Sequence, residues 1–142
     1  MRDILILLIF TSLNLCAALP PRVQDKIDAQ REEQNSQYKE QSPVVVEVKV
    51  ITVDSARGFF DSNYLHVHLE VEVIKTIKNK NNKSIPKELT FKYKNFSPID
   101  GWVGPKWFDL MIPEKEKTYK LYLDDNFTFN ARDESIEEVN ND

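Results

Sequence analysis

The two histidines of the chain lie two residues apart, at His66 and His68, in a run of alternating polar and apolar residues. Side chains at i and i+2 of a β-strand project from the same face, so the two imidazoles could share a metal ion. Glu70 and Glu72 continue that face, and Glu47 lies in a neighbouring predicted strand. His66, His68 and Glu70 are therefore a candidate metal site. The alternative is a solvent-exposed strand face whose polar residues are His and Glu.

The densest aromatic segment spans residues 101–108 and contains both tryptophans of the chain. Tryptophan is enriched at binding hot spots, and loops carry function more often than strands do. We therefore interpret Trp102, Trp107 and Phe108, in the predicted loop 97–113, as candidate residues for binding a protein partner. The alternative is that Trp107, Phe108 and Met111 fill the open end of a small barrel. In either case we expect Trp102 to be exposed.

Three Asn-x-Ser/Thr sequences are candidate glycosylation sites, with acceptors at Asn82, Asn126 and Asn95. The first two lie in predicted turns, whereas the third is followed directly by Pro98. Such sites are modified only in a eukaryotic secretory pathway. Because the chain is rich in asparagine, chance matches are the alternative.

The sequence contains no motif of a known catalytic class. A nucleophile elbow, a phosphate-binding glycine loop and a zinc-protease motif are all missing, and the chain has only three glycines. We therefore predict a non-enzymatic protein without a cofactor. The net charge of −4 gives no reason to expect a nucleic acid partner. A local run of lysines between residues 75 and 94 fits a solvated face, with anionic lipid or polysaccharide contact as the alternative.

The N-terminus has the layout of an export signal. Arg2 precedes an apolar run over residues 4–10, and the small residues Ala17 and Ala18 follow. The run is shorter than the ~20 apolar residues that a membrane-spanning helix needs. We therefore predict a signal peptide at residues 1–18 and a protein that is secreted or located in the periplasm or cell envelope.

Cys16 is the only cysteine, so the exported domain has no internal disulfide. Two interpretations of Cys16 are open. It can belong to a cleavage site that ends at Ala18, or it can be the lipidated cysteine of a bacterial envelope lipoprotein with a structural role. The segment 13–16 resembles a lipoprotein signal at Leu13, but Leu15 stands where a small residue is expected. We expect membrane attachment only if Cys16 is lipidated.

Residues 19–43 are mostly polar and charged, which predicts a flexible tether that contains at most a turn or two of helix. Alternating β-branched and polar residues then predict strands at 44–53, 64–78, 87–96, 118–123 and 127–131. A change of parity at Val73 and Ile74 predicts a β-bulge. In the turn after the first strand we expect Phe59 or Phe60 to fold over the core. Residues 132–142 form an acidic tail, with a short helix considered over 135–139.

Five strands, a long bent second strand and a long connection between the third and fourth predict an all-β, five-stranded OB-like barrel at 44–131. The strand sequences VVVEVKV (44–50), LEVEVIKTIK (69–78), LTFKY (89–93) and KTYKLYL (117–123) resemble the netrin/TIMP-like (NTR) group. This resemblance implies an extracytoplasmic barrel that serves as a binding module. Metalloproteinase inhibitors of that group chelate zinc through a disulfide-anchored N-terminal cysteine. Here the first strand begins far beyond Leu19 and Cys16 has no cysteine partner, so the resemblance does not carry protease inhibition over.

Overall fold

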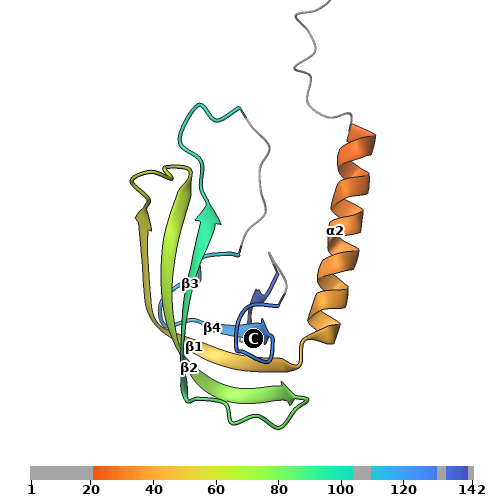
Figure 1. Ribbon diagram of the computed structural model, residues 1–142, viewed down its shortest axis with the longest axis vertical. Helices are drawn as coiled ribbons and strands as arrows, with labels where there is room; N and C mark the ends of the chain where they lie inside the picture. The colour runs from red at the N-terminus through yellow and green to blue at the C-terminus, as the bar shows by residue number, and fades with distance from the viewer. Residues whose placement is uncertain (1–20, 104–109, 131–133, 141–142) are drawn as a thin grey trace, which may run out of the picture. The chain divides into compact units, whose positions relative to one another are not determined.

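A computed structural model describes residues 21–103, 110–130 and 134–140. The predicted signal peptide at 1–18, Cys16, Trp107 and Phe108 lie outside the described residues. The chain divides into two units, Met1–Gln34 and Asn35–Asp142. Its described elements are one helix, α2 (Pro21–Gln41), and five strands: β1 (Val44–Arg57), β2 (Tyr64–Asn79), β3 (Glu88–Phe96), β4 (Thr118–Leu123) and β5 (Ile136–Glu138) (Figure 1). The fold is therefore mostly β; the predicted five-stranded β domain is present, but the chain also contains a helix and is not all-β.

The segment predicted as a flexible tether is helical from Pro21 to Gln41. Proline is tolerated in the first turn of a helix, and no glycine or further proline interrupts the segment. Gln, Glu, Lys, Arg and Ala, which dominate it, are strong helix formers. Within the first unit, the side chain of Asp28 accepts a hydrogen bond from Gln24 (3.0 Å) and pairs with Arg31 (3.5 Å). The prediction of a flexible tether considered only how little apolar surface the segment can bury. It underestimated the helix propensity of these residues and the contacts between neighbouring side chains.

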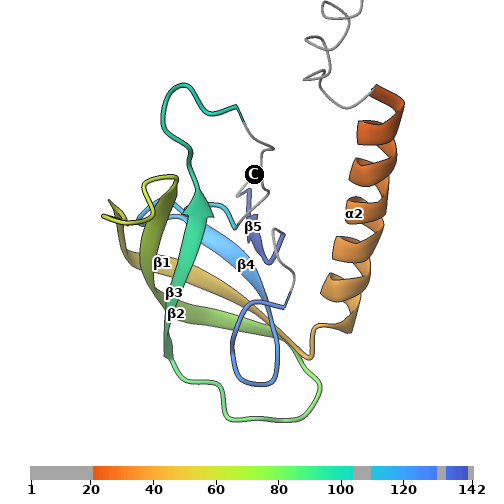
Figure 2. The same ribbon diagram turned by 45° about the horizontal axis from the view of Figure 1, so that its top comes forward.

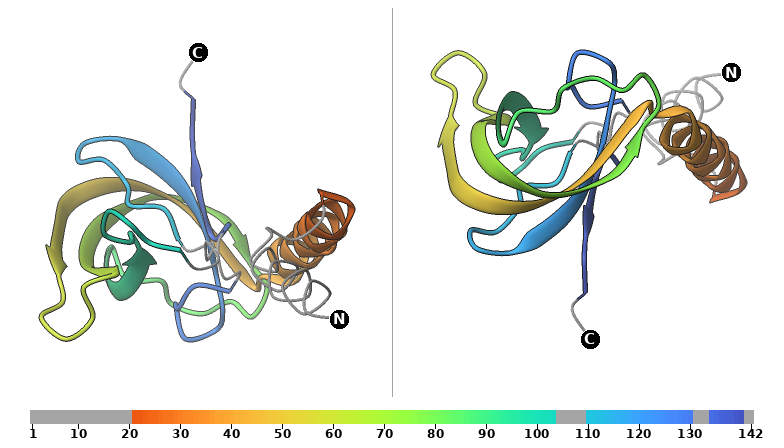
Figure 3. Two further views of the ribbon diagram at one scale, coloured as in Figure 1. Left: turned by 90° about the horizontal axis from the view of Figure 1, so that it is seen from above. Right: turned by 90° about the horizontal axis from the view of Figure 1, so that it is seen from below.

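The five strands form one antiparallel sheet in the order β3-β2-β1-β4-β5 (Figure 2). β1 is the central strand and pairs with both β2 and β4; Val46, for example, is registered with Thr76 on one side and Leu121 on the other. The sheet is strongly curved, which is clearest when it is seen end-on (Figure 3). In the part of the chain that the structure describes, no backbone pairing joins β3 to β5. The sheet is therefore open, and a closed barrel is not confirmed.

The predicted bulge at Val73 and Ile74 is confirmed. Glu47 is registered with Lys75 and Val48 with Val73, so Ile74 is an extra residue on β2. The register also contains two more extra residues, Ile77 on β2 and Ile51 on β1. Each of the three isoleucines is exposed. Because a bulge bends its strand and increases the local twist, these three bulges explain the curvature of β1 and β2.

The concave face of the sheet holds the core. Its members are buried side chains that alternate along the strands, together with two residues outside β1–β4: Val44, Val46, Val48, Val50, Leu69, Val71, Leu89, Phe91, Leu110, Tyr119, Leu121, Leu123 and Ile136. The alternation that predicted β2, β3 and β4 matches this burial, because alternate residues along these strands lie in the core or pack against it. The ring of Phe129 stacks on that of Phe91, with centroids 4.5 Å apart and planes at 25°. This side-chain contact joins β3 to the segment before β5 without backbone pairing.

The C-terminal region differs from the prediction. The fifth strand lies at Ile136–Glu138, where an acidic tail with a short helix was considered, and not at 127–131. A single bridge between Leu123 and Phe129 is all the pairing that the predicted strand makes among the described residues. The carboxylate of Asp124 explains this, because it accepts hydrogen bonds from the backbone N–H groups of Asn126 (2.8 Å) and Thr128 (2.9 Å) and so holds the chain in a turn.

Candidate functional site

Five large apolar side chains are exposed at one end of the sheet. The exposed fraction is 92% for Phe59, 97% for Phe60, 50% for Ile99, 40% for Trp102 and 96% for Val103. The first two lie in the turn between β1 and β2, and the other three in the segment that follows β3. Both segments are at the upper end of the sheet in Figure 1. We call these five residues the apolar tip.

The turn between β1 and β2 presents two phenylalanines to solvent. Backbone hydrogen bonds from Gly58 N to Tyr64 O (3.4 Å) and from Tyr64 N to Asp61 O (3.0 Å) close the turn. Phe59 and Phe60 pack edge to face against each other, with centroids 4.9 Å apart. The expectation that one of them folds over the core is wrong, because residues 58–61 lie beyond the end of the paired strands.

The segment after β3 is attached to this turn by hydrogen bonds. The Arg57 guanidinium donates from Nη1 to the carbonyl oxygens of Ser62 (2.7 Å) and Ser97 (2.5 Å). Asn63 adds two contacts, since its backbone oxygen accepts from Ser97 N (2.9 Å) and its side-chain Oδ1 from Ile99 N (3.3 Å). The two segments that carry the apolar tip are therefore attached to each other.

Trp102 is positioned by a reverse turn and by a row of aromatic rings. Trp102 N donates to Ile99 O (3.3 Å), and Gly101 between them has a φ of 86°, a conformation that favours glycine. The indole packs edge to face on Phe96 at 5.5 Å, and Phe96 packs on Tyr64 at 5.3 Å. Trp102 is therefore held in place while two-fifths of its surface is exposed, as predicted.

The described segment that leads to β4 begins at Leu110. Leu110 lies in the core, and Met111 does not. The Tyr93 hydroxyl donates to Met111 O (2.7 Å) and Asn95 Nδ2 donates to Leu110 O (2.8 Å). Leu110 is buried and Met111 is exposed. The idea that Met111 fills the end of the barrel is thus wrong by one residue, because these two side-chain contacts set the register of the chain. The same idea for Trp107 and Phe108 concerns residues outside the described part.

An ion pair lies next to the apolar tip. Lys94 Nζ lies 2.6 Å from Asp61 Oδ2 and 5.6 Å from the centroid of the Tyr64 ring. The hydrogen bond from Lys94 to Asp61 and the charge of that carboxylate raise the pKa of Lys94 above its ordinary value. An apolar centre with a polar, charge-paired rim is the usual anatomy of a protein–protein interface.

The predicted metal residues lie on one face of β2, but their neighbours are cationic. His66 is registered with Lys94 and His68 with Lys92 on the adjacent strand. The contact between His68 and Glu70 is long, with Nε2 of the histidine 3.9 Å from Oε1 of the glutamate. Within residues 21–103, 110–130 and 134–140, no three His, Cys, Asp or Glu side chains are grouped as a metal site requires. The geometry therefore supplies no complete ligand set for the metal hypothesis.

The candidate glycosylation residues Asn82 and Asn126 lie in loops at the end of the sheet away from the apolar tip. Both are exposed, whereas Asn95 is half-buried within β3.

No family model matches this sequence, and no curated protein or solved structure matches it either. The resemblance to the netrin/TIMP-like group therefore stays a prediction. Among the described residues, α2 is the one helix, and it is not apolar enough to cross a membrane.

The sequence interpretation found Trp102 but missed Phe59 and Phe60 as part of the same surface. A local signal was present, because two adjacent phenylalanines follow Gly58 in a segment with strand breakers. The link to Trp102 depends on Arg57 and Asn63, whose contacts span more than thirty residues and leave no pattern in the sequence.

Proposed function

We propose that this chain is an exported, non-enzymatic binding module that binds a protein partner through the apolar tip. The observation that carries the proposal is the exposure of three side chains, Phe59, Phe60 and Val103, each more than nine-tenths exposed at one end of the sheet. Large exposed apolar patches on soluble proteins usually mark interaction sites. Aromatic side chains are also the usual anchors of protein interfaces.

The charges around the tip favour a protein over a lipid surface. Surface-binding segments attract anionic lipids through unpaired Lys and Arg side chains next to the inserted apolar residues. Here Lys94 is paired with Asp61, and Arg57 donates to two backbone carbonyls. Asp100, at the tip, is exposed and adds negative charge. We therefore infer a partner that offers an apolar pocket with a polar rim.

We further propose that the open sheet is an OB-like barrel whose gap is closed by side chains. Phe129 contacts both Phe91 and Tyr93 of β3, the latter edge to face at 5.5 Å. OB-folds are five-stranded, partly open barrels that are often used as binding scaffolds. The resemblance of residues 44–131 to the netrin/TIMP-like group is proposed on the same basis.

The test of partner binding compares two double variants. The tip variant replaces Phe59 and Phe60 with Ser, and the control replaces Ile74 and Ile77, also exposed, with Ser. The secreted product is mixed with extracellular fluid from its source, cross-linked and analysed by mass spectrometry. We expect one protein to cross-link to the wild type and to the control, but not to the tip variant or to Trp102→Ala. Equal cross-linking by all variants would contradict the proposal.

A lipid occupant is tested separately by flotation with vesicles of phosphatidylcholine and phosphatidylserine. Flotation that the tip variant abolishes would assign the tip to a membrane and overturn the protein proposal.

Export is tested by expressing the full chain and sequencing the N-terminus of the product. We expect the mature chain to start at Leu19. A chain that retains Met1 in the cytosol would contradict export. A lipidated Cys16 would identify the protein as an envelope lipoprotein instead of a secreted one.

A further inference from the structure

The asparagines of β2, of β3 and of the loops after β2 and β4 fall into two groups. Four of them use the side-chain amide to hold the fold: Asn79 donates to Lys83 O (2.7 Å), Asn81 to Asp125 Oδ1 (2.6 Å), Asn95 to Leu110 O (2.8 Å) and Asn130 to Tyr38 O (2.6 Å). The amides of Asn82 and Asn126 make no side-chain hydrogen bond with any residue that the structure describes, and both residues are exposed.

Within this set of described residues, the two asparagines whose side-chain amides make no hydrogen bond are the two that begin glycosylation sequences in exposed loops. Asn82 is followed by Lys83 and Ser84, and Asn126 by Phe127 and Thr128. The third such sequence begins at Asn95, whose amide is engaged in β3 and which is half-buried. An asparagine in an exposed loop with Ser or Thr two residues later is the acceptor that N-glycosylation uses. The unbonded amides of Asn82 and Asn126 show in addition that a glycan at either residue would break no side-chain hydrogen bond of the described fold.

The backbone at the two sites is that of tight, exposed turns. Asn82 has a φ of 50°, a left-handed conformation that asparagine adopts more readily than most residues. Asn126 follows Asp124, whose carboxylate also accepts a hydrogen bond from the Thr128 hydroxyl (2.6 Å). Neither turn requires the amide of its asparagine, so a bulky substituent there leaves the fold intact.

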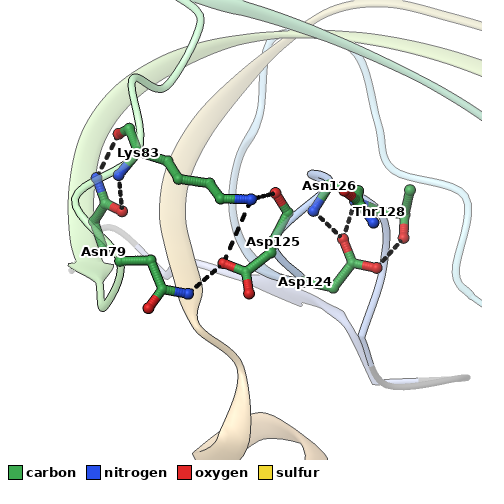
Figure 4. A network of polar contacts seen from close by, with 7 residues as sticks. Asn79, Lys83, Asp124, Asp125, Asn126 and Thr128 are labelled. Carbon is green, nitrogen blue, oxygen red and sulfur yellow. Dashed lines mark hydrogen bonds and ion pairs between the residues drawn. The ribbon is translucent and has the colours of Figure 1, made fainter.

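The two loops that carry these asparagines are joined. Lys83 Nζ donates to Asp125 O (2.6 Å) and lies 3.8 Å from Asp125 Oδ1 (Figure 4). Asn81 donates to the same carboxylate (2.6 Å). The loop between β2 and β3 and the loop after β4 therefore form one polar surface, and substituents at Asn82 and Asn126 would leave it from adjoining positions.

We propose that Asn82 and Asn126 carry N-linked glycans and that Asn95 does not. The donor is a lipid-linked oligosaccharide diphosphate. The amide Nδ2 attacks the first sugar carbon, a carbon–nitrogen bond forms, the bond from that carbon to the diphosphate breaks, and the amide proton is transferred to a base of the transferase. The lipid diphosphate leaves.

This assignment depends on the export part of the proposed function, because the donor is located in the secretory pathway. It also gives the two ends of the sheet different roles. β2 begins at the apolar tip and ends at the glycosylated loops, so the glycans cover the end of the sheet that does not bind and leave the tip accessible.

The experiment expresses the full chain in eukaryotic secretory cells, once with its own leader and once with a proven leader in place of residues 1–18. Electrophoretic mobility is compared before and after treatment with peptide N-glycosidase. We expect two glycans on the wild type, one on Asn82→Gln and one on Asn126→Gln, and none on the double variant. Ser84→Ala, which keeps Asn82 but breaks the sequence, serves as an independent check. Asn95→Gln should keep both glycans.

The two leaders separate the two proposals. Two glycans with the proven leader but a cytosolic, unmodified protein with the native leader would contradict export and support the acceptor sites. A protein that is secreted with the proven leader and carries no glycan at Asn82 and Asn126 would overturn the glycan proposal alone. Loss of a glycan in Asn95→Gln would overturn the distinction between free and engaged asparagines.

Discussion

Asn130 donates a hydrogen bond of 2.6 Å to the carbonyl oxygen of Tyr38, 92 residues earlier in the chain. The same amide donates to Ser42 Oγ (2.9 Å), and the buried Ser42 hydroxyl donates in turn to Tyr38 O (2.8 Å). The last carbonyls of a helix have no partner within the helix. Here the loop after β4 supplies one, so the C-terminal end of α2 belongs structurally to the sheet unit.

Replacing Asn130 with Ala should destabilise the sheet unit by about 1 kcal/mol, the net value of one such hydrogen bond, or more because Ser42 is buried. Urea unfolding of the purified chain, followed by far-ultraviolet circular dichroism, measures this loss. Asn126→Ala is the matched control, since the amide of Asn126 is exposed and makes no side-chain hydrogen bond in the described part of the chain. Equal stability of the two variants would show that Asn130 does not hold the helix end.

The contact between Phe91 and Phe129 should be measurable as a coupling energy. A stacked aromatic pair contributes ~0.5–1.5 kcal/mol beyond the area it buries. We expect a double-mutant cycle with Phe91→Leu and Phe129→Leu to give a coupling in this range, because either change alone removes the stacking at 4.5 Å. Chemical unfolding of the four proteins gives the value. A cycle that pairs Phe91→Leu with Ile74→Ala, at an exposed bulge, should be additive.

The strands and the bulge were predictable because they depend on local alternation. β1 to β4 begin within a residue of the predicted positions, and the parity change at Ile74 located a bulge. The bulges at Ile77 and Ile51 were not predicted, because the change of parity in the sequence is weaker there. An extra residue in a strand is recognised only against the register of its partner, and register depends on pairing between distant segments.

The end of the helix, β5 and the apolar tip were not predicted, because each depends on contacts between distant residues, whereas the body of the helix was missed because its local propensity was underestimated. The end of α2 is capped by Asn130 and by Lys78, whose Nζ donates to Glu40 O (2.8 Å). Residues 127–131 alternate like a strand, but the carboxylate of Asp124 holds the chain as far as Thr128 in a turn. The sequence likewise showed the aromatic residues of the tip but not the contacts that join its two segments.

Gly58 is required by the close approach of His66. A Cβ at position 58 would lie 2.7 Å from His66 Nε2, closer than real Cβ contacts allow. We expect Gly58→Ala to lower stability by about 1 kcal/mol, at the low end for overpacking, because the exposed imidazole can move. The thermal midpoint measures the loss. His66→Ala should restore most of it in the double variant; the same loss in both backgrounds would show that the strain comes from Asp61 or the backbone instead.

Tyr122 should make stability fall at alkaline pH. Burial, and then the hydrogen bond from its hydroxyl to Glu137 (2.8 Å) with the charge of that carboxylate, raise the pKa of Tyr122 from 10.0 to about 12. A pKa raised on folding favours the folded state fully below the unfolded value and loses that contribution as pH rises through the folded value. The loss attributable to Tyr122 therefore lies between about pH 10 and 12.

Tyr122→Phe should flatten the alkaline part of the stability curve, because the phenyl ring keeps the packing and has no proton to lose. Urea midpoints measured from pH 8 to 12 at constant ionic strength give the slope for each protein. Tyr38→Phe, at an exposed position, is the control. Several lysines with raised pKa values, among them Lys94, contribute a loss of the same sign, so the difference between variants is the informative quantity. Parallel curves for wild type and Tyr122→Phe would contradict the assignment, because a phenol that ionises equally in both states adds no slope.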